Sequence, residues 1–121
     1  MNFTANNNQP VVLVVDDDQD NLLLIGYQVS LLAACSVISA SNGNTALTMA
    51  QQFQPSLILL DVMLPDVDGL EVMRRLKQDP QTHHIPIVAV SAIAQTREIE
   101  RAIKAGFDDY LIKPYELESL E

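Results

Sequence analysis

The sequence predicts an α/β domain in which five parallel strands form an open, doubly wound sheet with helices on both faces. Strand-like and helix-like segments alternate along the 121 residues, with short connections and no repeat, linker or second domain. The strand-like segments are continuous apolar runs, which is typical of parallel strands buried on both faces. Right-handed crossovers between such strands place helices on both sides of the sheet.

The first predicted elements follow a polar N-terminus, residues 1–10, that we expect to be a disordered tail. Val11–Val15 is the first strand, and it runs directly into three consecutive aspartates. Asp20 and Asn21 are suited to cap the helix that follows. The apolar positions of this helix include Leu22, Leu23, Ile25, Val29 and Leu32.

A short second strand, Val37–Ala40, leads through a turn at residues 41–43 into the second helix, Asn44–Phe53. Pro55 ends that helix before the third strand begins. The apolar positions on one face of the helix are Leu47, Ala50 and Phe53.

The third strand, Leu57–Leu60, is wholly apolar and ends at the carboxylate of Asp61. A loop rich in turn residues continues to Gly69. An ionised carboxylate directly after a buried strand is costly unless a partner compensates it. This strand alone leaves two explanations open, a functional group or an ordinary cap or loop residue. The helix after the loop stops at Asp79-Pro80, and its apolar positions are Leu70, Met73 and Leu76.

The fourth strand, Ile85–Val90, ends at Ser91, and the next helix covers Thr96–Ala105. Gly106 stands where a C-terminal cap belongs. The apolar positions of this helix are Ile99, Ala102 and Ile103.

The fifth strand, Tyr110–Ile112, is very short and is followed by Lys113-Pro114. Residues 115–121 begin a last helix that we expect to be short or truncated. The predicted domain therefore spans residues 11–121.

Composition excludes several functions. The apolar fraction of 48% supports a real core, and the formal net charge is −9. Nucleic acid and anionic membrane would repel such a surface, so we expect neither as a partner. The single cysteine, Cys35, excludes an internal disulfide and is expected to be a small buried hydrophobe. There is no signal peptide and no apolar run near the ~20 residues that span a bilayer, so we expect a soluble, cytoplasmic protein.

Polar residues end the strands at one edge of the predicted sheet. We expect the strand order 2-1-3-4-5, which is common in doubly wound sheets. This order reverses between strands 1 and 3, and such sheets place their functional sites at that point. Asp16 and Asp17 follow strand 1, and Asp61 ends strand 3. Like charges ~4 Å apart repel by ~4 kcal/mol at an effective dielectric of ~20, and Mg²⁺ suits such oxygen ligands. Ser91 and Lys113, individually a cap and a solvated charge, complete a set suited to a metal–phosphoryl site.

With these residues in place, the chain resembles the receiver domains of two-component response regulators, which have a flavodoxin-like, CheY-like fold. The resemblance covers residue 11 to about residue 120 and depends on the order and spacing of four motifs. They are Val14-Val15-Asp16-Asp17-Asp18, the run from Leu59 to Gly69, Val90-Ser91-Ala92 and Lys113-Pro114. Pro86, Gly106 and Tyr110 also stand where the family has such residues.

The resemblance implies that Asp61 accepts a phosphoryl group from a histidine of a partner histidine kinase or phosphotransfer protein. Asp17 and Asp61 would bind Mg²⁺ directly, Asp16 would act through water, and the backbone carbonyl of Met63 would complete the protein ligands. Such a protein is not an enzyme in the usual sense. It catalyses only its own phosphotransfer and slow self-dephosphorylation.

A switch is also implied. Lys113 would pair with one phosphoryl oxygen and Ser91 would donate a hydrogen bond to another. As Ser91 moves inward, the ring of Tyr110 would fill the space it leaves. The face formed by the fourth helix, the fifth strand and the last helix would then change shape. We expect this face to bind a downstream effector or a second copy of the chain.

Two further expectations come from the resemblance. Receivers usually orient the water that removes the phosphoryl group from two positions, which are Met63 and Ile93 here. Neither side chain forms strong hydrogen bonds, so self-dephosphorylation should be slow. The family commonly has a cis peptide at Lys113-Pro114.

Other functions compete with this one. A degenerate receiver would act only as a phosphorylation-independent interaction module, and a hydrolase would form an aspartyl phosphate during turnover. The hydrolase would need an acid–base carboxylate where Met63 stands. A nucleotide or flavin carrier would need a phosphate-binding loop after strand 1, where three aspartates would repel phosphate. His83 and His84 lie between two prolines and are expected in a surface loop.

Overall fold

The computed structural model describes residues 10–33, 35–64 and 66–113. The predicted tail up to residue 9, the Lys113-Pro114 bond and the last helix over 115–121 lie outside the described residues. The elements, in chain order, are β1 (Val11–Val15), α2 (Gln19–Ala33), β2 (Ser36–Ala40), α3 (Gly43–Phe53), β3 (Leu57–Asp61), α4 (Gly69–Gln78), β4 (Ile87–Ser91), α5 (Thr96–Ala105) and β5 (Asp109–Ile112).

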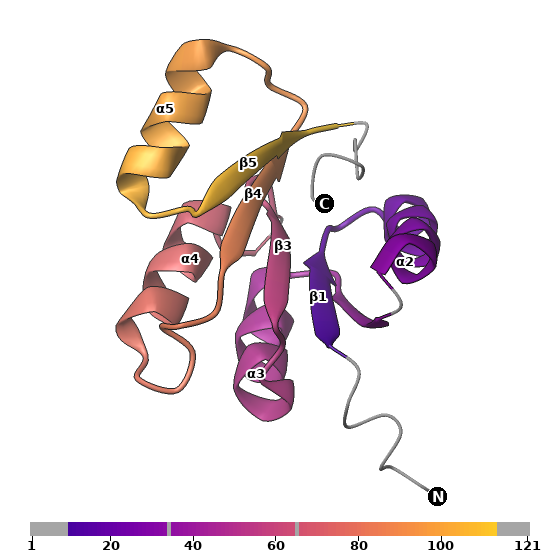
Figure 1. The fold of residues 1–121 in the computed structure, drawn as a ribbon. Helices are drawn as coiled ribbons and strands as arrows, with labels where there is room; N and C mark the ends of the chain where they lie inside the picture. The colour runs from indigo at the N-terminus through magenta and orange to yellow at the C-terminus, as the bar shows by residue number, and fades with distance from the viewer. Residues whose placement is uncertain (1–9, 34, 65, 114–121) are drawn as a thin grey trace, which may run out of the picture.

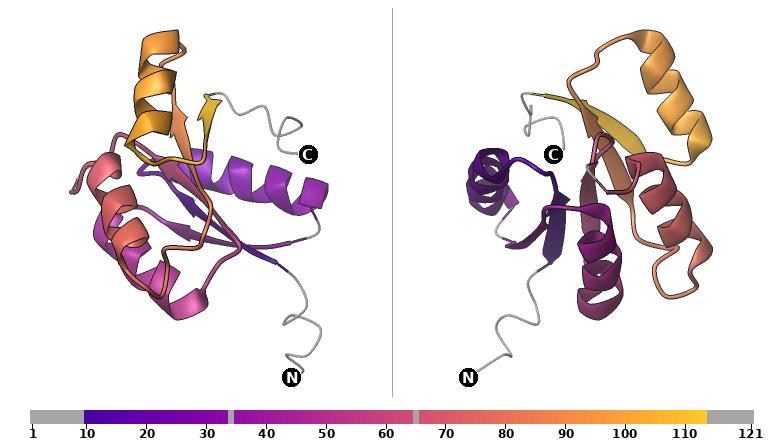
Figure 2. Two further views of the ribbon diagram at one scale, coloured as in Figure 1. Left: turned by 60° about the vertical axis from the view of Figure 1, so that its left-hand side comes forward. Right: turned by 180° about the vertical axis from the view of Figure 1, so that it is seen from behind.

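The strands form one parallel sheet in the order β2-β1-β3-β4-β5, which confirms the predicted fold class. Helix α2 covers one face of the sheet, and α3, α4 and α5 lie on the other side (Figures 1 and 2). The order reverses between β1 and β3, at the centre of the sheet. The carboxyl ends of these two strands therefore lie side by side.

Burial of each strand follows its place in the sheet. All five residues of β4 and the last four of β3 are buried, whereas the edge strands β2 and β5 each keep exposed residues. A central parallel strand is covered by helices on both faces and needs apolar side chains throughout. This is why the apolar runs identify the central strands so clearly.

Alternate strand residues enter two hydrophobic clusters. Leu13 and Val15 of β1 belong to the cluster beneath α3 and α4, and Val12 and Val14 belong to the cluster beneath α2. The second cluster includes Cys35, which is buried as predicted. The sheet is thus fixed from both faces, and its carboxyl edge is a rigid base for a site.

Some details of the helices differ from the sequence predictions. The cap of α2 is Asp18, whose Oδ1 accepts the N–H groups of Asp20 at 2.9 Å and Asn21 at 3.4 Å. Leu23 and Phe53 are 73% and 48% exposed, so neither belongs to the core. In α2 and α3, therefore, fewer of the apolar side chains are buried than the sequence pattern predicts. No helix among the described residues is long and apolar enough to cross a bilayer.

Helix α5 is the least embedded helix of the described chain. It contains no buried residue, and Ile103, predicted on its apolar face, is 43% exposed. The helix ends at Gly106 as predicted, with φ 133°, a conformation that favours glycine. A Cβ at Gly106 would also lie 2.9 Å from Sδ of Met73, so this turn packs closely against α4.

Candidate functional site

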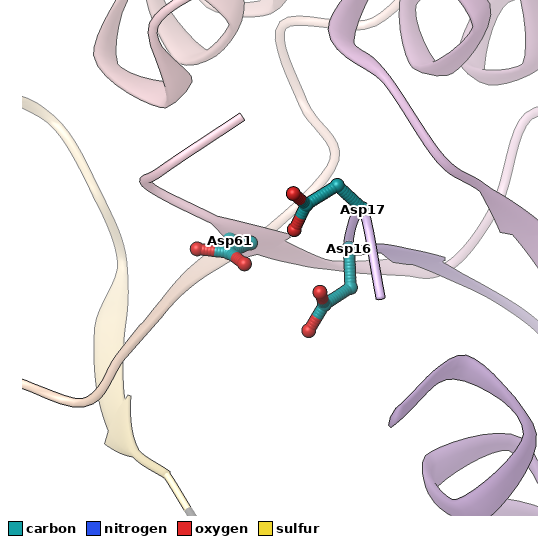
Figure 3. A group of neighbouring side chains, drawn as sticks. All are labelled: Asp16, Asp17 and Asp61. Atoms are coloured by element: carbon teal, nitrogen blue, oxygen red, sulfur yellow. The ribbon is translucent and has the colours of Figure 1, made fainter. Parts of the chain in front are cut away.

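Three carboxylates converge at the carboxyl edge of the sheet, as the sequence predicts. Asp16 and Asp17 directly follow β1, and Asp61 is the last residue of β3. Ligand oxygens of the three side chains all lie within 4.8 Å of one another (Figure 3). Asp16 and Asp61 are buried and Asp17 is exposed, so the group is open to solvent on one side.

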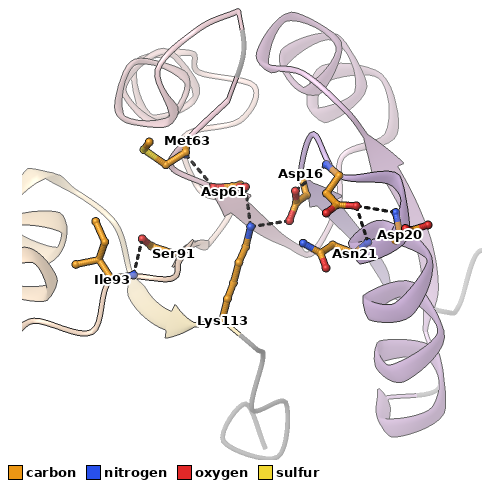
Figure 4. Close-up of polar contacts among 9 residues, drawn as sticks. Asp16, Asp20, Asn21, Asp61, Met63, Ser91, Ile93 and Lys113 are labelled. Atoms are coloured by element: carbon orange, nitrogen blue, oxygen red, sulfur yellow. Dashed lines mark hydrogen bonds and ion pairs between the residues drawn. The ribbon is translucent and has the colours of Figure 1, made fainter.

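Lys113 reaches into this acidic group from the end of β5. Ser91 pairs with Ile112 in the sheet, and the N–H of Lys113 donates to the carbonyl oxygen of Ser91 at 2.8 Å. From this position Nζ lies 2.8 Å from Oδ2 of Asp61 and 2.9 Å from Oδ2 of Asp16 (Figure 4). One ammonium thus bridges the two buried carboxylates.

Burial raises the pKa of Asp61, although the hydrogen bonds from Lys113 and from the backbone of Met63 oppose this rise. Burial alone would lower the pKa of Lys113. The hydrogen bond to Asp61 and the contact with Asp16 outweigh burial and raise that pKa above its usual range. Lys113 therefore stays charged. When all groups are ionised, three carboxylates and one ammonium give the pocket a charge of −2.

The acidic group fits a hard divalent cation. Oδ1 of Asp16 accepts the N–H of Asp18 at 2.9 Å, whereas the buried Oδ2 has no aligned hydrogen bond and only the ion pair with Lys113. A buried oxygen without an aligned donor, beside an exposed carboxylate on Asp17, is a donor set suited to a hard divalent cation. No other group of this kind is found within the described residues.

The loop after β3 keeps the backbone of Met63 beside Asp61. The N–H of Met63 donates to Oδ1 of Asp61 at 2.8 Å, while Lys113 takes Oδ2. The Met63 side chain is 71% exposed and extends away from the carboxylate (Figure 4). The two oxygens of Asp61 therefore face different partners.

Ser91 and Tyr110 meet at the backbone of Ile93. The hydroxyl oxygen of buried Ser91 accepts the N–H of Ile93 at 3.1 Å, and its proton is left to donate elsewhere. The hydroxyl of Tyr110 donates to the carbonyl oxygen of Ile93 at 2.8 Å. A cavity of about 270 Å³ adjoins these residues, beneath α5, and includes Leu70 and Phe107 in its lining.

Residues 12–121 match the response regulator receiver domain family. The chain belongs to this family. Receiver domains typically accept a phosphoryl group rather than turn over a substrate, and their partners are histidine kinases. The acidic group of Asp16, Asp17 and Asp61 agrees with the metal site that is typical of receivers.

The chain matches part of the length of several curated relatives. The chain is 38% identical over 100 residues to the DNA-binding dual master transcriptional regulator RpaA of Synechocystis, covering 83% of this chain and 38% of that protein. It is 45% identical over 78 residues to the response regulator PleD of Caulobacter vibrioides, covering 64% and 17%. It is 44% identical over 77 residues to the polar-differentiation response regulator DivK of Brucella anthropi, covering 64% and 63%. The receiver thus spans less than two thirds of each of these relatives.

Solved structures agree with the fold. The receiver domain of Francisella response regulator 1452 is 30% identical, with a TM-score of 0.82 over 92% of this chain and 89% of that one. A two-component response regulator from Clostridium difficile is 31% identical, with a TM-score of 0.79 over 93% and 89%.

The remaining acidic residues of the receiver's motifs shape its loops. Asp68 caps α4 by accepting the N–H of Leu70 at 3.0 Å, and Asp66 accepts N–H groups of Gly43 at 2.7 Å and Asn44 at 3.0 Å. The motif alone marked both as loop residues. It gave no signal that Asp66 reaches the start of α3. His83 and His84 are exposed in a turn, as predicted.

Proposed function

We propose that this receiver is phosphorylated on Asp61 by a partner histidine kinase or phosphotransfer protein, with Mg²⁺, in a two-component system or phosphorelay. The observation that carries the proposal is the contact of Lys113 with Asp61, 2.8 Å from Nζ to Oδ2, at the floor of the acidic group. Burial raises the pKa of this carboxylate, and the hydrogen bond from the ammonium opposes that rise and favours the ionised form. The carboxylate of Asp61 thus lies beside an ammonium that can pair with a phosphoryl oxygen and beside an open acidic pocket that can hold a divalent cation.

In the transfer step an oxygen of Asp61 attacks the phosphorus of the partner's phosphohistidine. An O–P bond forms, the P–N bond breaks, and its electron pair remains on the imidazole nitrogen. Lys113 would then pair with a phosphoryl oxygen instead of the free carboxylate. Ser91 keeps a hydroxyl proton with which it can donate to another. The work of the protein is therefore positioning and neutralisation of charge.

Asp17 and Asp61 would hold Mg²⁺ directly, Asp16 would act through water, and the backbone carbonyl of Met63 would complete the protein ligands. When bound, the ion neutralises charge that develops on the phosphoryl oxygens. The pocket charge of −2 supports a divalent rather than a monovalent cation.

Tyr110 and α5 would carry the signal. Movement of Ser91 toward a phosphoryl group would strain its bond to Ile93, whose carbonyl also binds Tyr110. Helix α5 contains no buried residue, so it is suited to change its position when Ser91 and Tyr110 move. The face of α5 and β5, where Ile103 and Ile112 are 43% and 37% exposed, would bind a second copy or an effector in the phosphorylated state.

The kinase would dock on α2. This helix starts beside the acidic group (Figure 4), and its Leu23 and Leu24 are 73% and 55% exposed. Leu23→Glu should slow phosphorylation by the cognate kinase about tenfold, the effect of losing one strong interface contact. Phosphorylation by a small donor should be unchanged. Equal slowing with both donors would contradict docking on this face.

A degenerate receiver that only binds a partner is the competing function. Such a protein gains nothing from one ammonium against two buried carboxylates, because apolar side chains in their place would stabilise the fold as well or better. Labelling decides between the two functions.

The test is incubation with Mg²⁺ and acetyl phosphate, followed by intact-mass measurement. The parent should gain one phosphoryl group, and Asp61→Asn should gain none. Asp68→Asn, which removes a nearby loop carboxylate, should be labelled like the parent. Labelling that persists in Asp61→Asn or in the presence of a strong chelator would refute the assignment.

A further inference from the structure

The loop between β3 and α4, residues 62–68, is attached to α3 as well as to α4. Oδ1 of Asp66 accepts the N–H of Gly43 at 2.7 Å, and Oδ2 accepts the N–H of Asn44 at 3.0 Å. Both amides belong to the first turn of α3 and have no partner within the helix. The hydrogen bond from Gly43 is the main reason why the pKa of Asp66 is lowered, so the carboxylate is ionised at neutral pH.

The start of α3 also lies very close to the loop and to α4. A Cβ on Gly43 would lie 2.8 Å from Cγ2 of Val72 and 3.1 Å from Cβ of Val67. Only glycine allows the start of α3 to approach the loop and α4 so closely. The two Asp66 hydrogen bonds therefore join surfaces that are already in contact.

Other bonds fix the two ends of the loop. The N–H of Val62 donates to the carbonyl oxygen of Val90 at 3.2 Å, and the N–H of Gly69 donates to the carbonyl oxygen of Val62 at 3.2 Å. Asp68 caps α4 from within the same loop. Among the described residues, Asp66 alone bonds the middle of the loop to a neighbouring helix through its side chain.

We propose that Asp66 is a positioning residue of the metal site. By holding the loop against α3, it fixes the backbone of Met63 relative to Asp17 and Asp61. Asp17, Met63, Asp66 and Asp68 are among the residues that line one open cleft. The proposal rests on the proposed function, because it assigns Mg²⁺ to the Met63 carbonyl. Residues that orient metal ligands typically contribute 10–100-fold to metal affinity.

The experiment is a calorimetric Mg²⁺ titration of the unphosphorylated chain. Asp66→Ala loses both hydrogen bonds and should weaken binding about tenfold. Asp66→Asn keeps one acceptor oxygen and should weaken it less, and it serves also if the alanine variant does not fold. Hydrogen exchange should show faster exchange at the amides of Gly43 and Asn44 in both variants.

Asp68 is the matched control. It lines the same cleft, has the same charge and also caps a helix, but it bonds only the helix of its own loop. Asp68→Ala and Asp68→Asn should leave Mg²⁺ affinity within twofold of the parent. If the Asp66 and Asp68 variants weakened Mg²⁺ binding equally, the loss of one negative charge would explain the effect. That result would overturn the proposal. Unchanged affinity in Asp66→Ala would overturn it too.

The outcome for the parent separates this proposal from the proposed function. A parent that binds Mg²⁺ and is labelled at Asp61, with Asp66 variants that bind equally well, would refute only the role of Asp66. A parent that neither binds Mg²⁺ nor is labelled would refute both.

Discussion

The hydroxyl of Tyr110 donates a 2.8 Å hydrogen bond to the carbonyl oxygen of Ile93, two residues beyond Ser91. The N–H of the same residue donates to the hydroxyl oxygen of Ser91 at 3.1 Å. The backbone of Ile93 therefore joins the two side chains that would carry the switch. Neither bond can be lost without freeing the start of the segment that leads into α5.

Tyr110→Phe tests this link. The ring stays and the hydroxyl goes, so the free energy of unfolding should fall by about 0.5–1.5 kcal/mol, the value of one hydrogen bond. Amide exchange should accelerate over residues 92–96 and stay unchanged in β1. Acetyl phosphate labelling should keep its rate, because the hydroxyl contacts neither Asp61 nor Lys113 in this structure. A uniform rise of exchange across the sheet would argue against a local link.

The lifetime of the phosphorylated state is a second test. Met63 and Ile93 are 71% and 42% exposed and offer no strong hydrogen bond to an attacking water. In Met63→Asn combined with Ile93→Glu, decay in Mg²⁺ should be at least tenfold faster, since general acid–base help contributes ~10²–10⁴ in rate. Ile103→Glu alone adds the same charge on α5, away from Asp61, and should decay like the parent. Decay no faster than that of the parent would refute the tuning role.

Much of this site could be predicted from the sequence because it is built from strand ends. Once Val11–Val15 and Leu57–Leu60 are identified as neighbouring parallel strands, their aspartates must meet at one edge. The neighbour relation itself came from known strand orders and from the family resemblance. Lys113 follows for the same reason, since β5 pairs in parallel with β4.

Residues whose partners are distant or set by packing could not be predicted. Asp66 bonds amides more than 20 positions earlier, and no local pattern marks such a contact. In α2, four consecutive apolar residues, 22–25, left the buried face ambiguous, and contact with the sheet selected Leu22 and Ile25. The same helix is capped by Asp18 and not by Asp20, because an aspartate at either position can accept N–H groups of the first helical turn.

Asp108 provides a prediction for pH. Its Oδ2 accepts the N–H of Ile87 at 2.8 Å and Nζ of Lys77 at 2.9 Å. Burial would raise the pKa of Asp108, but these two bonds outweigh it and lower the pKa below the usual 3.8. A lowered carboxyl pKa stabilises the fold above the unfolded-state pKa, and this contribution is lost as the pH falls through the folded-state pKa.

Asp108→Asn should therefore lower the free energy of unfolding by about 1 kcal/mol at pH 7, a modest value because the side chain is 46% exposed. The difference from the parent should shrink below about pH 4. Urea unfolding followed by circular dichroism measures it, since the chain has no tryptophan. Glu100→Gln, which removes one exposed carboxylate from α5, is the control and should show little difference at either pH. A difference that grows toward acid would contradict the argument.

Lys113→Met separates the two tasks of the lysine. Without the ammonium, Asp16 and Asp61 face each other uncompensated, so the metal-free protein should lose about 3 kcal/mol of stability. The pocket charge becomes −3 instead of −2. Mg²⁺ should then bind more tightly than in the parent and restore much of the lost stability.

Phosphorylation of Lys113→Met should change in the opposite direction. The phosphoryl group would lose its ammonium partner, and the loss of one such donor typically costs ~10²–10³ in rate. Labelling by acetyl phosphate at saturating Mg²⁺ should therefore slow by that factor although the metal binds better. Lys113→Arg keeps the charge in a larger, planar group and should retain most of the stability and the Mg²⁺ affinity of the parent. Its labelling should still be slower than that of the parent, because a guanidinium cannot occupy the position of Nζ between Asp16 and Asp61. Labelling of Lys113→Met at the parent rate would leave Lys113 with a structural role only.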